Sequence, residues 1–163
     1  HVAHGSLVGI GEICQYILKH ETDDPRILEI IELAVSLDVP ILQHASTREH
    51  TDGVDRLAAA FPKARFIMAH IGGMYNWPHG IDVARRHDNV WVDTSGFVML
   101  CLGAFRRAVS TLGPEKILFG VDFPLITAGP LVAMLEKTCL HRKGVERIAW
   151  KNTAELFHLP ATA

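Results

Sequence analysis

Short apolar runs recur along the chain, and each ends in polar residues able to bind a metal or move a proton. The last run, 116–121, ends at Asp122 and is followed two residues later by Pro124, which cannot donate to a strand ladder. Buried parallel strands form such continuous hydrophobic runs because both of their faces are covered. The same pattern occurs four more times, at 7–12, 40–44, 64–70 and 89–96. The sequence therefore predicts five buried parallel strands.

Segments with helical spacing separate these runs. An Asp-Asp-Pro sequence at 23–25 marks a helix start, and apolar residues then recur every three or four positions. A second helix is expected to be capped at 51–52 and to end before Pro62. Further helices are expected at 81–87, 101–112, 130–139, 145–150 and 152–157. This alternation of strands and helices predicts an α/β fold with a parallel sheet.

The strand ends recur at a regular interval. His70 follows His44 by 26 positions, and Asp122 follows His70 by 52. An eight-unit α/β barrel of about 250 residues uses roughly 31 residues per unit, so 163 residues hold about five units. Five strands cannot close such a barrel. We therefore expect residues 1–163 to form a single domain, which is either the C-terminal part of a (β/α)8 TIM-type barrel or an open α/β sheet.

Composition and charge fit an ordinary globular domain. Of the residues, 48% are apolar and 21% charged, and the net charge of −2 offers no surface for nucleic acid. No apolar run approaches the roughly 18–20 residues of a membrane span, so we expect no membrane partner. Residues 1–6 carry neither an initiator Met nor a secretory leader, which we interpret as a cut inside a longer chain.

The cysteines favour a reducing, cytoplasmic compartment. They number three, an odd count without paired spacing, and this argues against a disulfide scaffold. Cys14, two residues after Glu12, is either a soft metal ligand or a buried thiol.

Four strand-end groups are candidates for one shared site: Glu12, His44, His70 and Asp122. Taken singly, a strand-end histidine is usually a hydrogen-bonded structural residue, and a carboxylate can simply cap a loop. Because the carboxyl ends of parallel strands share one rim, we expect the four side chains to lie close together. Two imidazoles and two carboxylates match the ligand preferences of Zn²⁺ and similar divalent ions. The pattern therefore predicts a metal site.

Such a site could activate water. A divalent ion lowers the pKa of a water bound to it toward about 7, and a neighbouring carboxylate can accept the proton. Asp122 is the candidate for this base.

Other polar residues are weaker candidates. His79 and Trp77 lie in an aromatic loop, and they either contact the substrate or belong to an ordered loop cluster. The remaining histidines are expected to face solvent: His1, His4, His20, His50, His87 and His141.

Six segments, in this order, resemble the amidohydrolase 2 family of TIM-barrel proteins, which holds metal-dependent hydrolases and nonoxidative decarboxylases. They are 8–13, 40–44, 69–73, 89–96, 119–124 and 152–157. In that family the barrel carries a divalent metal, commonly zinc. The resemblance implies hydrolysis of a small-molecule amide, ester or lactone by metal-activated water, with nonoxidative decarboxylation as the alternative.

The resemblance also implies roles for single residues. His44 corresponds to the metal ligand on strand five, and His70 to the strand-six histidine, which binds a second metal or the substrate. Asp122 corresponds to the strand-eight aspartate that contacts the metal and shuttles the proton. Glu12 corresponds to the end of strand four, where some relatives have a metal-binding carboxylate. The segment 152–157 resembles the family's closing helix and is structural.

The sequence departs from the family in one respect. The family's His-x-His pair on strand one lies far before strand four, and His1 and His4 have the wrong spacing to replace it. Strands one to three are therefore expected to be missing. Because two of the usual ligands are then absent, we expect the chain alone to bind metal poorly and to be inactive. The alternative to an enzyme is a half-barrel that forms a homo-oligomer, because an open sheet exposes edge strands and apolar helix faces.

Overall fold

The computed structural model describes residues 7–101, 103–137 and 141–160. The segment 1–6, with His1 and His4, lies outside the described residues, as does Cys139 at the expected end of the helix 130–139.

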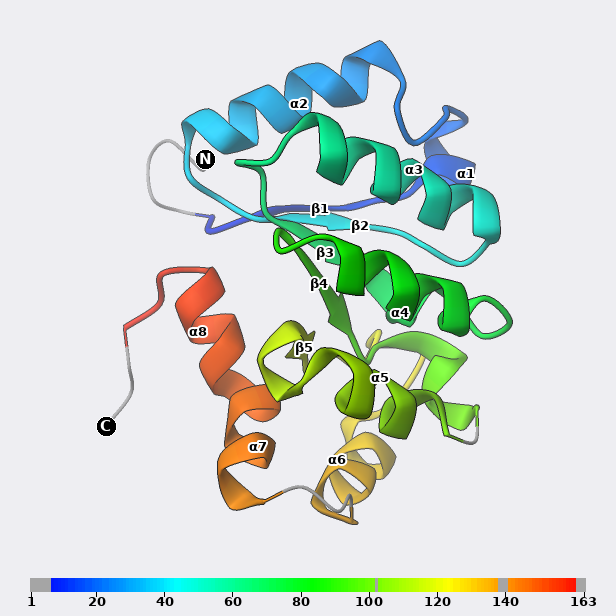
Figure 1. Ribbon diagram of the computed structural model, residues 1–163, viewed down its shortest axis with the longest axis vertical. Helices are drawn as coiled ribbons and strands as arrows, with labels where there is room; N and C mark the ends of the chain where they lie inside the picture. Colours follow the sequence, from blue (N-terminus) through cyan, green and yellow to red (C-terminus); the bar gives the residue numbers. More distant parts are fainter. Residues whose placement is uncertain (1–6, 102, 138–140, 161–163) are drawn as a thin grey trace.

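In the part of the chain that the structure describes, five parallel strands form one sheet (Figure 1). Every strand pairs with its neighbour in the sequence, and the order is β1-β2-β3-β4-β5. A doubly wound sheet reverses its strand order, whereas a barrel keeps it sequential, so this order is that of a TIM-type barrel segment. The strands are β1 (Ile10–Ile13), β2 (Ile41–Gln43), β3 (Phe66–Met68), β4 (Val90–Asp93) and β5 (Ile117–Leu118).

The helices follow the strands in the predicted alternation. They are α1 (Gln15–Leu18), α2 (Pro25–Ser36), α3 (Arg48–Ala60), α4 (Trp77–Arg86), α5 (Ala104–Leu112), α6 (Ala128–Lys137), α7 (Arg142–Glu146) and α8 (Asn152–Leu156). A π-helical turn at Arg147–Lys151 joins α7 directly to α8. The two short helices predicted at 145–150 and 152–157 are therefore parts of one continuous helical segment.

Two helix starts show where local signals suffice and where they do not. α2 begins as predicted, because Asp24 caps it and Pro25 occupies its first turn. The predicted start of α3 was wrong: Thr47 is the cap, and its hydroxyl accepts a hydrogen bond from the His50 N–H. Thr51 instead lies buried inside the helix and donates to the Thr47 carbonyl. Both threonines have capping chemistry, and the structure uses the earlier one.

The two faces of the sheet have different covers. Alternate strand residues, such as Ile41 and Phe66, are fully buried in a large core that includes the apolar sides of α2 to α5. The residues between them, such as Ile67 and Leu118, face the other way and pack against Leu156 of α8. The closing helix therefore packs on part of the second face of the sheet, which supports its predicted structural role.

Asn152 ties α8 to the end of β5. Its buried side-chain amide donates to the carbonyls of Pro114 at 2.7 Å and Ile117 at 2.8 Å. We expect Asn152→Ala to lower the free energy of unfolding by about 1–3 kcal/mol, because it leaves two carbonyls without their donor. Chemical denaturation measures the loss. Ser110→Ala on the exposed side of α5 is the control, with an expected change within about 0.5 kcal/mol; an equally small change for Asn152→Ala would contradict the assignment.

Among the described helices, none has the length and apolar character needed to cross a bilayer.

Candidate metal centre

Three neighbouring strands bring Glu12, His44 and His70 to one edge of the sheet. Glu12 lies in β1, His44 directly follows β2, and His70 lies in the 3-10 turn Ala69–Gly72 that follows β3. The register pairs Gln43 with Met68 across β2 and β3, so the two histidines leave the sheet at nearly the same height. The shared rim that the sequence predicts is therefore formed by these three residues.

Their side chains converge on one point. Glu12 Oε1 lies 2.8 Å from His44 Nδ1 and 3.3 Å from His70 Nε2. The same two ring nitrogens are 3.3 Å apart. The rings meet edge to face, with centroids 5.0 Å apart and planes inclined by 72°. One nitrogen of each ring thus faces the carboxylate, and the three ligand atoms lie within 4.8 Å of one another.

This donor set fits a divalent cation. Two imidazole nitrogens and a carboxylate oxygen are ligands that Zn²⁺ and related ions accept. Without a cation, three electron-pair donors this close to one another need shared protons between them. This need shows in the shifted pKa values of Glu12 and His70.

Hydrogen bonds and charges within the cluster shift the pKa values of Glu12 and His70. The pKa of Glu12 falls to about 2, first because of its hydrogen bond with His44 and then because of that with His70. Burial pushes the pKa of His70 down, but the hydrogen bond to Glu12 and the negative charges of Asp93, Glu12 and Asp122 outweigh it and raise this pKa. Glu12 is therefore ionised throughout the physiological pH range, and an ionised carboxylate is able to bind a cation.

Asp122 lies on the same cavity but outside this cluster. It follows β5 by four residues, has left-handed backbone geometry (φ 67°), and its carbonyl accepts hydrogen bonds from the N–H groups of Leu125 and Ile126. With His44 and His70 it lines a cavity of about 420 Å³. Among the described residues, the group whose ligand atoms are close enough to hold a metal ion comprises Glu12, His44 and His70 without Asp122. Its role as a ligand stays a prediction.

The walls of this cavity are mainly apolar and aromatic. The side chains involved are Tyr16, Met74, Tyr75, Phe97, Val98 and Leu125. Tyr75 is 93% exposed and Phe97 52%, so their rings are free to contact a ligand. A cavity of this kind suits the apolar body of a small molecule.

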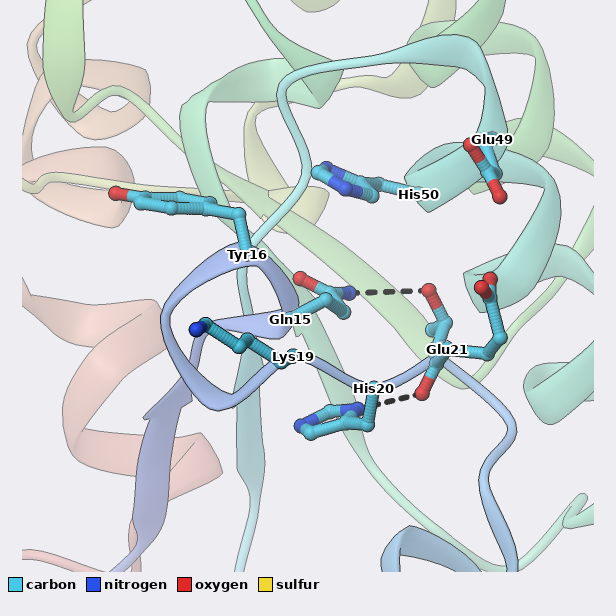
Figure 2. Close-up of a pocket in the computed structure, with 8 residues that line it drawn as sticks. Gln15, Tyr16, Lys19, His20, Glu21, Glu49 and His50 are labelled. Atoms are coloured by element: carbon cyan, nitrogen blue, oxygen red, sulfur yellow. Dashed lines mark hydrogen bonds between the residues drawn. The ribbon is translucent and has the colours of Figure 1, made fainter.

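A second, polar pocket has a volume of about 270 Å³, and Figure 2 shows the side chains that line it. Tyr16 lines both pockets. Gln15 lines the polar pocket, and its side-chain amide donates to Thr22 Oγ1 at 3.0 Å and to the His44 carbonyl at 3.2 Å. Gln15 therefore holds the backbone at His44 in place.

His79 and Trp77 lie in the first turn of α4. His79 Nε2 is 2.6 Å from Asp52 Oδ1 of α3, and Trp77 is half-buried against the main core. Neither belongs to the lining of the 420 Å³ cavity. Their contacts favour the interpretation as an ordered cluster, and a contact with substrate stays a prediction.

Three histidines expected to face solvent are partly buried instead. The ring of His50 lies 5.6 Å from that of His44, and burial lowers the pKa of His50. His87 Nε2 lies 2.5 Å from Asp55 Oδ1 of α3, and the Glu21 carbonyl accepts a hydrogen bond from His20 Nδ1 at 2.6 Å. The expectation was wrong for His50 and His87 because their neighbours come from other elements, which a local pattern does not bring into view. The contact of His20 is with the carbonyl of the next residue. His141 is exposed as expected.

Cys14 is a buried thiol. It is 6% exposed, and burial raises its pKa. Of the two interpretations that the sequence leaves open, the structure favours the structural one.

Gly96 controls the position of the His70 ring. Its φ of 73° is left-handed, and a Cβ at this position would lie 2.6 Å from His70 Nδ1. We expect Gly96→Ala to displace the ring and to weaken Zn²⁺ binding about tenfold to a hundredfold, as measured by competition with a chelator. Gly103→Ala is the matched control: its φ is 88°, but a Cβ there meets nothing within 4 Å. Equal losses in both variants would attribute the effect to backbone strain and contradict this role.

Two residues of the site were not assigned a role from the sequence. Asp93 and Ser95 lie at and just after the end of β4, and both contact His70. The signal was present, because the run 89–96 ends in polar residues like the others.

Residues 1–159 match the model of the protein family described as Amidohydrolase, so the chain belongs to the amidohydrolase family. This is the family that the sequence motifs resemble. No curated protein matches the chain.

Solved structures share the fold at low sequence identity. An uncharacterized TIM-barrel protein from Bordetella bronchiseptica has a TM-score of 0.73 at 17% identity, covering 85% of this chain and 52% of that one. A dihydroxybenzoic acid decarboxylase from Polaromonas sp. JS666, with bound manganese and the inhibitor 2-nitroresorcinol, has a TM-score of 0.67 at 19% identity. The match covers 86% of this chain and 56% of that one. An amidohydrolase from Burkholderia multivorans with bound zinc has a TM-score of 0.71 at 14% identity, and the match covers 85% of this chain and 59% of that one.

These similarities establish a partial (β/α)8 barrel. The chain spans between 52% and 59% of the length of these three structures.

Proposed function

We propose that this chain carries the metal centre of a metal-dependent hydrolase that acts on a small-molecule amide, ester or lactone. The observation that carries the proposal is the convergence of Glu12, His44 and His70, whose ligand atoms lie 2.8 to 3.3 Å apart. Membership of the amidohydrolase family supports it. Relatives with bound manganese or zinc support a divalent ion, and we propose zinc because two of the three donors are imidazole nitrogens.

The chain's residues divide the work by position. Glu12, His44 and His70 would hold the ion, which when bound polarises a carbonyl oxygen and lowers the pKa of water. Asp122, on the same cavity but apart from the cluster, would accept the proton of the attacking water and deliver it to the leaving group. His70 also faces the cavity and would orient the reacting carbonyl. The apolar walls would exclude bulk water and bind the body of the substrate.

Nonoxidative decarboxylation is the second candidate. The aromatic side chains of Tyr16, Tyr75 and Phe97 on the cavity suit a flat unsaturated acid, and the Polaromonas relative is a decarboxylase of dihydroxybenzoic acid. Product analysis of the intact enzyme distinguishes the two reactions. Hydrolysis yields a carboxylic acid with an amine or alcohol, whereas release of carbon dioxide would overturn the hydrolase proposal.

Metal content tests the enzyme proposal against an inactive half-barrel. Elemental mass spectrometry of the purified chain, combined with light scattering, gives the metal stoichiometry and the oligomeric state together. One equivalent of metal per chain supports the metal centre. A homo-oligomer that stays metal-free after incubation with Zn²⁺ would support the half-barrel.

We also propose a cytoplasmic location. The two described cysteines, Cys14 and Cys101, are free thiols, as expected in a reducing compartment. Fractionation of the source cells tests this, and recovery outside the cytoplasm would contradict it.

A further inference from the structure

Asp93 and Ser95 form a closed hydrogen-bonded pair behind His70. Ser95 Oγ lies 2.6 Å from Asp93 Oδ1 and 2.9 Å from His70 Nδ1, which is the ring nitrogen that faces away from Glu12. Asp93 is 8% exposed and Ser95 6%, so bulk water does not compete for these bonds. None of the roles assigned to the metal ligands or to Asp122 uses this pair.

The hydrogen atoms of this pair can be assigned by counting donors. Asp93 Oδ1 accepts the backbone N–H of His70 at 2.9 Å and that of Ser95 at 3.0 Å. Because Asp93 Oδ1 already accepts two N–H groups, it carries no hydrogen of its own and is an acceptor in its third contact as well. The hydrogen in that contact is therefore the one on the Ser95 hydroxyl. Ser95 Oγ is then an acceptor toward His70, and His70 Nδ1 must carry a hydrogen.

The assignment determines what His70 presents to the cluster. A neutral imidazole carries one N–H, so a hydrogen on Nδ1 leaves Nε2 with its lone pair. Nε2 is the atom 3.3 Å from both Glu12 Oε1 and His44 Nδ1. A metal ligand needs a lone pair there, and in metal sites the bond at the other ring nitrogen selects the tautomer.

We propose that Asp93 and Ser95 are positioning residues that hold neutral His70 as its Nδ1–H tautomer and aim the Nε2 lone pair at Glu12 and His44. The purpose of this arrangement rests on the proposed metal centre. The tautomer itself is a property of the metal-free chain, so the two can be tested separately.

Long-range ¹⁵N–¹H correlation spectra of the metal-free chain, at an alkaline pH where the rings are neutral, distinguish the two tautomers directly. His70 is assigned by the loss of its signals in His70→Asn. We expect the parent chain to show His70 as the Nδ1–H form. In Ser95→Ala the ring loses its acceptor, and we expect a mixture of both forms with Zn²⁺ affinity reduced about tenfold to a hundredfold.

Ser46→Ala is the matched control within the same site. Ser46 Oγ lies 2.9 Å from His44 Nε2, so this variant removes a serine from the other histidine and is expected to leave His70 in the Nδ1–H form. Circular dichroism compares the folding of both variants with that of the parent.

Two results would overturn the inference. One is a parent spectrum in which His70 carries its hydrogen on Nε2, which needs no variant to fold. The other is a folded Ser95→Ala chain that keeps a pure Nδ1–H form. A parent chain with the expected tautomer but no affinity for Zn²⁺ would support the positioning role while overturning the proposed metal centre.

Discussion

Replacing Glu12 with glutamine is expected to reduce the affinity of the chain for Zn²⁺ about a hundredfold or more. Loss of a residue that merely orients a metal ligand typically costs tenfold to a hundredfold, and Glu12 itself supplies the charge at the point where both histidines converge. Because the pKa of Glu12 is about 2, that charge is fully present at neutral pH. Competition with a chromogenic chelator measures the affinity.

Glu49→Gln is the matched control for this change. Glu49 lines the neighbouring polar pocket, and its replacement by glutamine removes the same charge at a position outside the group of candidate metal ligands. We expect its affinity to stay within a few-fold of the parent. An unchanged affinity in Glu12→Gln would place the ion somewhere other than this cluster.

Asp122→Asn is expected to lower the turnover of the intact enzyme by a factor on the order of a hundred or more, because an amide cannot accept the proton that a general base removes. Steady-state kinetics with the enzyme's substrate measure the effect. Zn²⁺ affinity of the same variant shows whether the carboxylate also touches the ion.

Asp82→Asn on the exposed side of α4 is the control for Asp122→Asn, with turnover expected to stay at the parent level. Full turnover in Asp122→Asn would remove this residue from the mechanism, whatever its effect on metal binding.

The strands were predictable because buried parallel strands leave an unusually plain pattern. Four of the five apolar runs contain the observed strands, and the first, 7–12, overlaps β1, which extends one residue further to Ile13; each strand is shorter than its run. The run 64–70 shows the reason: its ladder ends at Met68, and the next residues turn into Ala69–Gly72, where His70 and Ile71 have left-handed backbone geometry. A run of apolar residues indicates which residues are buried, including those that lie outside the hydrogen-bonded strand.

The candidate site was predictable as far as the strands alone position it. Glu12, His44 and His70 lie at or next to strand ends, so the parallel register brings them together. Asp122 lies four residues beyond the short strand β5, and there the loop decides where its carboxylate points. The position of Asp122 after a strand therefore predicted that it lies at the shared rim, but not whether its carboxylate joins Glu12, His44 and His70.

The partners of His70 and His79 were not predictable in the same way. Ser95 and Asp52 reach them from elements 25 and 27 positions away, through the packing of neighbouring βα units. A pattern along one element gives the polarity of a residue and no information on which residue faces it.

The central claim is that Glu12, His44 and His70 bind one divalent ion. Crystals of the chain soaked in Zn²⁺, with diffraction recorded at the zinc absorption edge, test it directly. The account predicts one anomalous peak about 2.0–2.2 Å from Glu12 Oε1, His44 Nδ1 and His70 Nε2. A peak at other residues, or none at saturating Zn²⁺, would contradict it.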